Sequence, residues 1–236
     1  MKKRILIKIS GASLKGADNT FEYDKVIAIA QQIKELTKKY LVSIVVGGGN
    51  IFRGNFENNF SLDKNDAHAI GMLATMINGI ILFNVFKNNN IKTKLFSAVK
   101  IDKFIDEYTT RSVNEALENE YVCIFVGGTG NPHFTTDTGA TLRAIETKST
   151  LILMGKNGVD GVYSSDPKVN NNSIRYNKLT YLDIINKSLE VMDHSALTLC
   201  KENNIDILVF DINLPNSIID ALNKKINTTL ISNEGK

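Results

Sequence analysis

The sequence predicts an α/β protein, a three-layer α/β/α sandwich with a mainly parallel central sheet. Short β-rich runs alternate along the chain with longer segments of helical periodicity, which indicates a parallel sheet with helices on both faces. Residues 44–46 and 123–126 are apolar at every position, as is typical of central parallel strands. A length of 236 residues with 43% hydrophobic content suffices for a sizeable core.

The elements follow one another in a regular order. A first strand interrupted by Lys8 leads into a helix where Val26, Ala30 and Ile33 recur at helical spacing. The expected strands are residues 4–10, 42–46, 93–97, 121–126, 150–154, 207–210 and 229–231. The expected helices are residues 23–39, 67–86, 114–118, 136–147, 181–186, 195–203 and 217–225. We expect one domain over residues 1–236, with two lobes that meet near residue 149.

The charge of the chain argues against a nucleic-acid partner. Lys+Arg number 28 and Asp+Glu 25, a formal net charge of +3, whereas dedicated nucleic-acid binders usually show a strong basic bias. Arginine is scarce, which makes each position informative: Arg4, Arg53, Arg111, Arg143 and Arg175.

Targeting signals are weak, and we expect a cytoplasmic protein. The apolar stretch after the basic start is short, contains Lys8 and has no cleavage site behind it. The longer apolar segment 69–86 is interrupted by Thr75 and Asn78, which favours a buried or subunit-interface helix over a membrane span. Cys123 lies in an apolar run and is expected to be a small buried side chain.

Three predicted strands run directly into glycine-rich loops. Residues 8–11 read Lys-Ile-Ser-Gly, 47–54 read Gly-Gly-Gly-Asn-Ile-Phe-Arg-Gly, and 127–132 read Gly-Gly-Thr-Gly-Asn-Pro. The carboxyl ends of parallel strands face one edge of a sheet, and glycines there let backbone N–H groups approach an anion. The Walker A and dinucleotide patterns are both incomplete. Three such loops in succession favour a site for more than one phosphate group.

Two cations accompany these loops. Lys8 is either an outward-facing lysine on an edge strand or a cation aimed at a transferred phosphate, and the nearby Gly11 favours the second interpretation. Arg53 suits bidentate recognition of phosphate, and the alternative is a solvated loop arginine.

Polar residues after the later strands are further candidates. Thr135 or Thr136 would cap the helix 136–147, and with Asp137 they would also fit contact with a ligand or magnesium. Tyr163, in the polar segment 156–167, either stacks on a base or is a half-buried loop aromatic. His133 is placed for substrate contact, whereas His68 and His194 favour structural roles, and no histidine spacing indicates zinc.

Together these segments resemble the bacterial uridylate kinases (UMP kinases) of the amino-acid kinase fold. The matching motifs occur in family order over nearly the whole chain, at residues 8–11, 47–54, 71–75, 128–137, 159–163, 166–167 and 191–193. The Gly-Thr-Gly-Asn-Pro run followed by Phe-Thr-Thr-Asp is specific to the UMP-using branch. The resemblance implies transfer of the γ-phosphoryl group of ATP to UMP, with Mg²⁺ held mainly by ATP phosphates and no metal site of the protein's own.

The resemblance also implies a set of site residues and an assembly. The implied catalytic residues are Lys8, Arg53, Asp137 and Asp160, with Asp193 a further participant. The implied ATP-binding residues are Lys8, Ile9, Ser10, Gly11, Gly49, Arg53, Asn157, Tyr163 and Asp166. The implied UMP-binding residues are Gly48, His68, Thr129, Gly130, Asn131, Pro132, His133, Phe134, Thr135 and Thr136. UMP would bind to the lobe 1–149 and ATP to the lobe 150–236, in a homohexamer built as a trimer of dimers.

The chain departs from the family pattern in two places. The family usually has an aspartate that contacts the UMP ribose at the position of His68, so His68 or the nearby Asp66 would take over that contact. Residues 16–24 lack the glycine-rich sequence of the family's GTP-responsive loop, so GTP activation does not follow from the resemblance.

Three other functions compete with this interpretation. An enzyme of the same fold acting on a carboxylate or carbamate is disfavoured by residues 128–132. A non-catalytic nucleotide-binding module is disfavoured by the presence of Lys8, Arg53 and Asp160. An RNA-binding regulator is disfavoured because the chain has no basic stripe.

Overall fold

A computed structural model describes residues 2–17, 19–53, 60–170 and 172–234. Asp18, in the loop 16–24, and Gly54, in the second glycine loop, lie outside the described residues.

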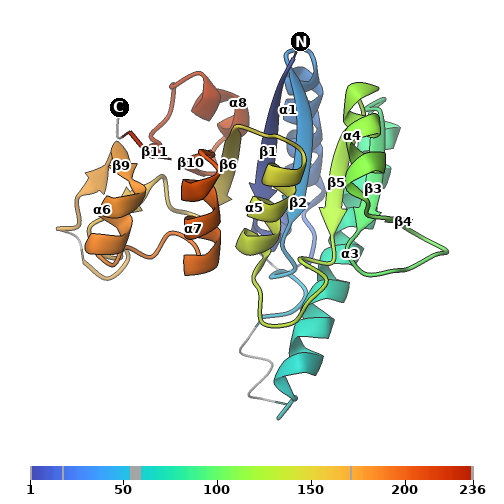
Figure 1. The fold of residues 1–236 in the computed structure, drawn as a ribbon, viewed down its shortest axis with the longest axis horizontal. Helices are drawn as coiled ribbons and strands as arrows, with labels where there is room; N and C mark the ends of the chain where they lie inside the picture. Colours follow the sequence, from blue (N-terminus) through green and yellow to red (C-terminus); the bar gives the residue numbers. More distant parts are fainter. Residues whose placement is uncertain (1, 18, 54–59, 171, 235–236) are drawn as a thin grey trace.

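Within the described residues a nine-stranded sheet forms the centre of the protein, in the order β4-β3-β5-β2-β1-β6-β10-β11-β9 (Figure 1). Neighbouring strands pair in parallel except β10 and β11, which are antiparallel. The predicted mainly parallel sheet is therefore confirmed. The strands are β1 (Lys3–Ile9), β2 (Tyr40–Val46), β3 (Thr93–Ser97), β4 (Asp106–Glu107), β5 (Val122–Val126), β6 (Leu151–Lys156), β9 (Lys178–Thr180), β10 (Asp206–Asp211) and β11 (Thr229–Ser232).

Helices cover both faces of this sheet, as predicted. Side chains alternate between the faces along each strand, so Ile5 and Ile7 of β1 join one apolar cluster while Leu6 joins the other. The first cluster contains side chains of α1 (Tyr23–Thr37), α3 (Lys64–Asn88) and α8 (Ser217–Leu222). The second contains side chains of α4 (Thr110–Glu118), α5 (Thr136–Glu146), α6 (Tyr181–Asn186) and α7 (His194–Glu202). Cys123 is buried in the second cluster and unpaired, as expected.

The predicted elements are all present, with differences at their ends. β3 and α6 have the predicted bounds, whereas α3 begins at Lys64 because Asp63 caps it, accepting a hydrogen bond from Asn65 N at 2.8 Å. The short elements absent from the prediction are the 3₁₀ helix η1 (Gly11–Leu14), β4, β9 and a separate antiparallel ribbon of β7 (Val162–Tyr163) and β8 (Arg175–Tyr176).

Among the described helices, α3 alone is long and apolar enough to span a membrane by length and composition. A single such helix is weak evidence, because a core helix of a soluble protein meets the same criteria. In this chain α3 packs its buried side chains, including Leu82 and Phe86, into the first apolar cluster. Its buried polar side chains have a separate role at the site.

Candidate active site

The three glycine loops meet at the edge of the sheet where β1, β2 and β5 end, at the bottom of Figure 1. A Cβ atom on Gly11 would lie 2.5 Å from Gly49 N and 2.7 Å from Gly47 O, so the first two loops are in backbone contact. A Cβ atom on Gly139 of α5 would lie 3.2 Å from the carbonyl carbon of Gly128, in the third loop. A side chain at Gly11 would collide with the second loop, and one at Gly139 would be tight against the third, so glycine favours these close approaches between distant segments.

Buried polar side chains of α3 hold the second and third loops. Asn78 Nδ2 donates to Gly47 O at 2.6 Å, and Thr75 Oγ1 accepts a hydrogen bond from Gly127 N at 2.8 Å. Asn78 also exchanges hydrogen bonds with the side chain of Asn50. Both α3 residues are almost inaccessible to solvent. The polar residues that interrupt this apolar helix therefore position the loops.

Lys8 and Asp137 form a buried ion pair next to the loops. β1 lies between β2 and β6, so the interpretation of Lys8 as an edge-strand lysine is wrong. Lys8 is 9% exposed, and its Nζ lies 2.8 Å from Asp137 Oδ1 in the first turn of α5. Apart from this ion pair, Asp137 Oδ1 has no hydrogen-bond partner in the described part of the chain.

Lys156 is a third charged residue of this group, with no role predicted from the sequence. It ends β6, whose neighbour β1 carries Lys8, and its Nζ donates to Val191 O. Burial lowers the pKa of the Lys156 ammonium, the charge of Asp137 opposes this effect, and the charge of Lys8 adds to it. The prediction ended this strand at residue 154. A lysine directly after an apolar strand, like the one within the first strand, was the available signal.

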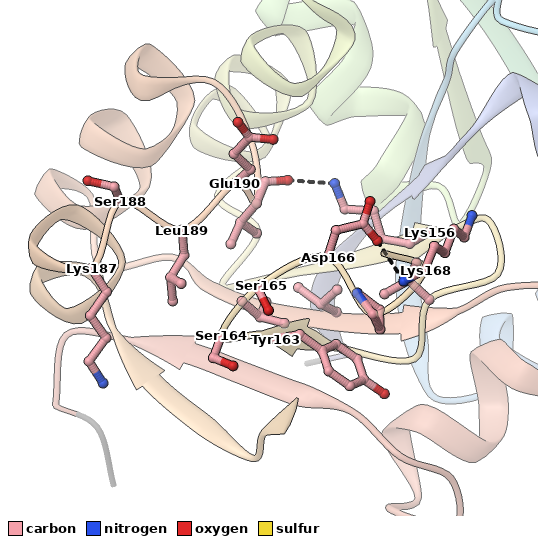
Figure 2. Close-up of a pocket in the computed structure, with 16 residues that line it drawn as sticks. Lys156, Tyr163, Ser164, Ser165, Asp166, Lys168, Lys187, Ser188, Leu189 and Glu190 are labelled. Carbon is pink, nitrogen blue, oxygen red and sulfur yellow. Dashed lines mark hydrogen bonds between the residues drawn. The ribbon is translucent and has the colours of Figure 1, made fainter. Parts of the chain in front are cut away.

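A first cavity of about 450 Å³ extends from this group. Lys156, Tyr163 and Asp166 line it together with the segment 187–191 (Figure 2). Tyr163 lies on β7 and is half-buried, and its hydroxyl donates to Asp160 Oδ1 at 2.6 Å. Of the residues expected for ATP, Tyr163 and Asp166 therefore face one cavity.

A second cavity of about 380 Å³ lies between the second and third glycine loops and α3. It shares no lining residue with the first, but Thr136, the neighbour of Asp137, lines it, as does Gly49. The residues expected for UMP that line it are Gly48, His68, Thr129, Asn131, Phe134, Thr135 and Thr136. Lys156 lines the first cavity and Asp137 directly follows Thr136 in the wall of the second, so the charged group is adjacent to both cavities.

The remaining residues expected for UMP lie beside the second cavity. Gly130, Pro132 and His133 belong to the same loop but do not line the cavity. The His133 ring meets the ring of His68 edge-on at 5.0 Å between centroids, and its Nε2 lies 3.0 Å from Asn65 Oδ1. The two histidines are therefore neighbours, which their separation in sequence did not indicate.

No described contact links Asp160 to the ion pair of Lys8 and Asp137. Its partners are Tyr163 and Asn227, whose Nδ2 donates to Asp160 Oδ2 at 2.8 Å. Burial favours a raised pKa for Asp160, but these hydrogen bonds and the charge of Arg175 outweigh it and lower the pKa. Asp160 thus supports Tyr163 in the wall of the first cavity.

Other residues expected for ATP lie along the first two loops or outside the cavity lining. Ile9 is buried, Ser10 precedes η1, and exposed Arg53 has its Nε 3.5 Å from the position of a Cβ atom on Gly49. Asn157 accepts a hydrogen bond from Asn213 at 2.8 Å and does not line the first cavity.

Asp193 joins two helices near the site. Its Oδ2 accepts hydrogen bonds from Thr135 Oγ1 at 2.6 Å and Thr138 Oγ1 at 2.8 Å, and its Oδ1 caps α7 through Ala196 N. Burial tends to raise the pKa of Asp193, but these hydrogen bonds prevail and lower it. This geometry assigns Asp193 to holding α5 against α7.

Comparison with known proteins gives matches over the whole site. The model of the amino acid kinase family matches residues 3–211, which include every residue lining both cavities. The uridylate kinase of Ureaplasma parvum serovar 3 is 50% identical over 232 residues, covering 98% of this chain and 99% of that protein. A crystal structure of UMP kinase from Ureaplasma parvum, 50% identical, has a TM-score of 0.96 and covers 98% of this chain and 99% of its own. UMP kinase from Bacillus anthracis, 36% identical, has a TM-score of 0.93, with 98% and 96% covered.

Proposed function

Because this chain belongs to the amino acid kinase family, among its uridylate kinases, we propose that it transfers the γ-phosphoryl group of ATP to UMP. The products are UDP and ADP, and the reaction belongs to pyrimidine nucleotide metabolism. The observation that carries the proposal is the charged group of Lys8, Asp137 and Lys156, which is adjacent to two cavities of nucleotide-binding size.

In the proposed mechanism ATP occupies the first cavity and UMP the second. A phosphate oxygen of UMP attacks the γ-phosphorus, and the bond from this phosphorus to the β,γ-bridging oxygen breaks, so its electron pair leaves with ADP. The attacking oxygen is already anionic near neutral pH and needs no strong general base. Catalysis therefore consists mainly of positioning and charge stabilisation.

The chain offers cations and backbone donors for this task. Lys8 and Lys156 would stabilise the negative charge that develops on the moving phosphoryl group. Asp137 holds the Lys8 ammonium in place, since the two atoms that pair are 2.8 Å apart. Arg53, beside Gly49, would reach the phosphates from the second loop.

The residues present fit a magnesium ion that enters with ATP. Asp137 Oδ1 is buried and has no hydrogen-bond partner besides its ion pair with Lys8 in the described residues, so the Asp137 carboxylate is a candidate to face the magnesium ion as well as Lys8. Bound magnesium supplies charge neutralisation to the phosphates. The phosphates themselves would provide most of its ligands.

Self-association through α3 is part of the proposal. Leu73, Ile77 and Ile80 are 52%, 47% and 37% exposed and recur at helical spacing, which makes an apolar stripe. A contact between two such stripes would form the dimer within a homohexamer, a trimer of dimers. We further propose that the protein acts in the cytoplasm.

A substrate panel tests the proposed reaction. ADP release is measured with ATP and magnesium against UMP, CMP, AMP, GMP, carbamate and acetylglutamate. UMP should exceed every other acceptor by about 100-fold or more in kcat/KM, because a site that hydrogen-bonds a base rejects others strongly. A carboxylate or carbamate acceptor that outperforms UMP would establish a different enzyme of the same fold, and no ADP release would indicate a binding module.

A further inference from the structure

A third cavity lies at the opposite edge of the sheet from the proposed active site. It has a volume of about 720 Å³ and shares no lining residue with the first two cavities. Residues near the beginnings of β1, β2, β6 and β10 line it, together with the end of α8. The proposed nucleotide sites lie where β1, β2, β5 and β6 end, so this cavity is separate from them.

The lining of the third cavity combines an apolar floor with a cationic rim. Several half-buried side chains of the core form its floor: Tyr40, Leu151, Leu208, Leu222 and Ile226. The rim carries four cationic side chains, Lys3, Arg175, Lys178 and Lys224, against one carboxylate, Asp206. An apolar floor beside an excess of cations suits an anion with an apolar part.

Three of these cations are unpaired. Within the described residues the Lys3, Lys178 and Lys224 side chains make no hydrogen bond or ion pair, and all three are exposed. Arg175 is half-buried, and its guanidinium donates to Thr228 O at 2.7 Å and Asn227 Oδ1 at 3.3 Å. A guanidinium with free lysines beside it matches a phosphate group better than a single charge would.

Hydrogen bonds connect this rim to the wall of the first cavity. Arg175 donates to Asn227, Asn227 donates to Asp160 Oδ2 at 2.8 Å, and the Tyr163 hydroxyl donates to Asp160 Oδ1 at 2.6 Å. Arg175 and Tyr163 are also register partners in the ribbon of β7 and β8. Tyr163 lines the first cavity, so a ligand that draws Arg175 away from Asn227 disturbs the support of that wall.

We propose that the third cavity binds a small organic phosphate with a flat apolar part, and that its occupancy changes the affinity for ATP. The apolar part lies on the floor, and the phosphate meets Arg175 and the rim lysines. The link runs from Arg175 through Asn227 and Asp160 to Tyr163. The effect on ATP rests on the proposed function, whereas the binding site does not.

Calorimetry with 1-naphthyl phosphate tests the site. The full chain is saturated with ADP and UMP, so that the two nucleotide cavities are filled, and 1-naphthyl phosphate, 1-naphthalenemethanol and inorganic phosphate are titrated separately. The variant Lys178→Glu/Lys224→Glu reverses two rim charges, and its control Lys103→Glu/Lys225→Glu reverses two exposed charges outside the cavity. In the unchanged protein we expect 1-naphthyl phosphate to bind more tightly than the naphthyl alcohol or inorganic phosphate. Its affinity should fall by about tenfold or more in the rim variant and stay unchanged in the control variant.

Three results would overturn the site. The first is that the naphthyl alcohol binds as tightly as 1-naphthyl phosphate, and the second is that inorganic phosphate does so. The third is that both double variants lose the same affinity for 1-naphthyl phosphate. The naphthyl alcohol result would indicate an apolar occupant, and the phosphate result would indicate an adventitious ion only. Calorimetry needs no turnover, so these outcomes can be interpreted even if the UMP assay shows no activity.

The KM for ATP tests the connection. In the unchanged protein 1-naphthyl phosphate should shift this KM by about fivefold. The shift should vanish in the rim variant, which no longer binds the probe in the third cavity. If the probe instead competed with ATP in the nucleotide cavity, the shift would persist in this variant. Asn227→Ala should still bind the probe but lose the shift, since it removes the side chain that bridges Arg175 and Asp160 by hydrogen bonds. Binding without any shift in the unchanged protein, or a shift that survives in Asn227→Ala, contradicts the connection.

Discussion

Lys8 occupies a position where an unpaired ammonium would be costly. It lies on a central strand and is almost fully buried, and Asp137 supplies the opposite charge. Replacement by alanine removes the cation from the path of the phosphoryl group and leaves Asp137 unpaired. We expect Lys8→Ala to lower kcat by about two or more orders of magnitude in an ADP-release assay. Lys39→Ala, at an exposed position in the turn after α1, serves as the control. Near-normal turnover of Lys8→Ala excludes the assigned role.

Lys156 gives the reaction a predicted pH dependence. Burial lowers the pKa of its ammonium, so the free enzyme loses this charge at a lower pH than an ordinary lysine would. If the charge stabilises the moving phosphoryl group, kcat/KM for ATP falls on the alkaline side of neutrality. Arginine stays protonated throughout this range, so Lys156→Arg should shift the alkaline fall to higher pH. The measurement is a pH profile of kcat/KM for both proteins, and coincident alkaline limbs would exclude the assignment.

At the residue scale, the sequence identified Lys8 and Asp137 but not the third member of the group. Lys8 was visible because it interrupts an apolar run, and Asp137 because it opens a helix with two threonines. Lys156 ends its strand after an apolar run and Gly155, and this weaker contrast did not identify it. The partners of Asp160 were also not predictable, because Asn227 lies far along the chain.

At the scale of elements, α3 shows how a buried amide can position a loop. Asn78→Ala leaves Gly47 O without the Asn78 donor. It also removes both hydrogen bonds between Asn78 and the Asn50 side chain, which keeps its bond to Thr20 O. We expect a loss of about 1–3 kcal/mol in the free energy of unfolding, measured by urea denaturation, and a raised KM for UMP. Asn84→Ala is the matched control, because Asn84 is exposed on the same helix and, within the described residues, donates only to Ile80 O. Equal effects of the two substitutions would contradict the role of Asn78.

Element lengths explain what sequence patterns could and could not predict. Long periodic segments such as α1 and apolar strands such as β5 were found within a few residues. The ribbon of β7 and β8 has two residues per strand, too few for any periodicity. This ribbon forms part of the wall of the first cavity and its link to the third, so the missed elements matter for function.

At the scale of the whole molecule, strand order brings the site together. β1 pairs with β2 on one side and β6 on the other, which sets Ile9 opposite Gly155 and brings Lys8 and Lys156 to neighbouring strands. Alternating elements predicted a parallel sheet, but several strand orders satisfy that pattern. The order is decided by packing contacts between distant segments, which one sequence does not display.

The exposed apolar stripe of α3 predicts how the subunits assemble. Leu73 and Ile77 are exposed in the single chain, so replacing both with aspartate should leave the fold stable while placing charges within the proposed dimer contact. Light scattering during gel filtration should then give a mass below that of the hexamer. Leu182→Asp, at a 54% exposed apolar position on α6, should keep the hexameric mass. A hexameric Leu73→Asp/Ile77→Asp protein would place the subunit contacts elsewhere. A chain that is monomeric without substitution would leave the stripe exposed to solvent, which apolar patches of this kind rarely are.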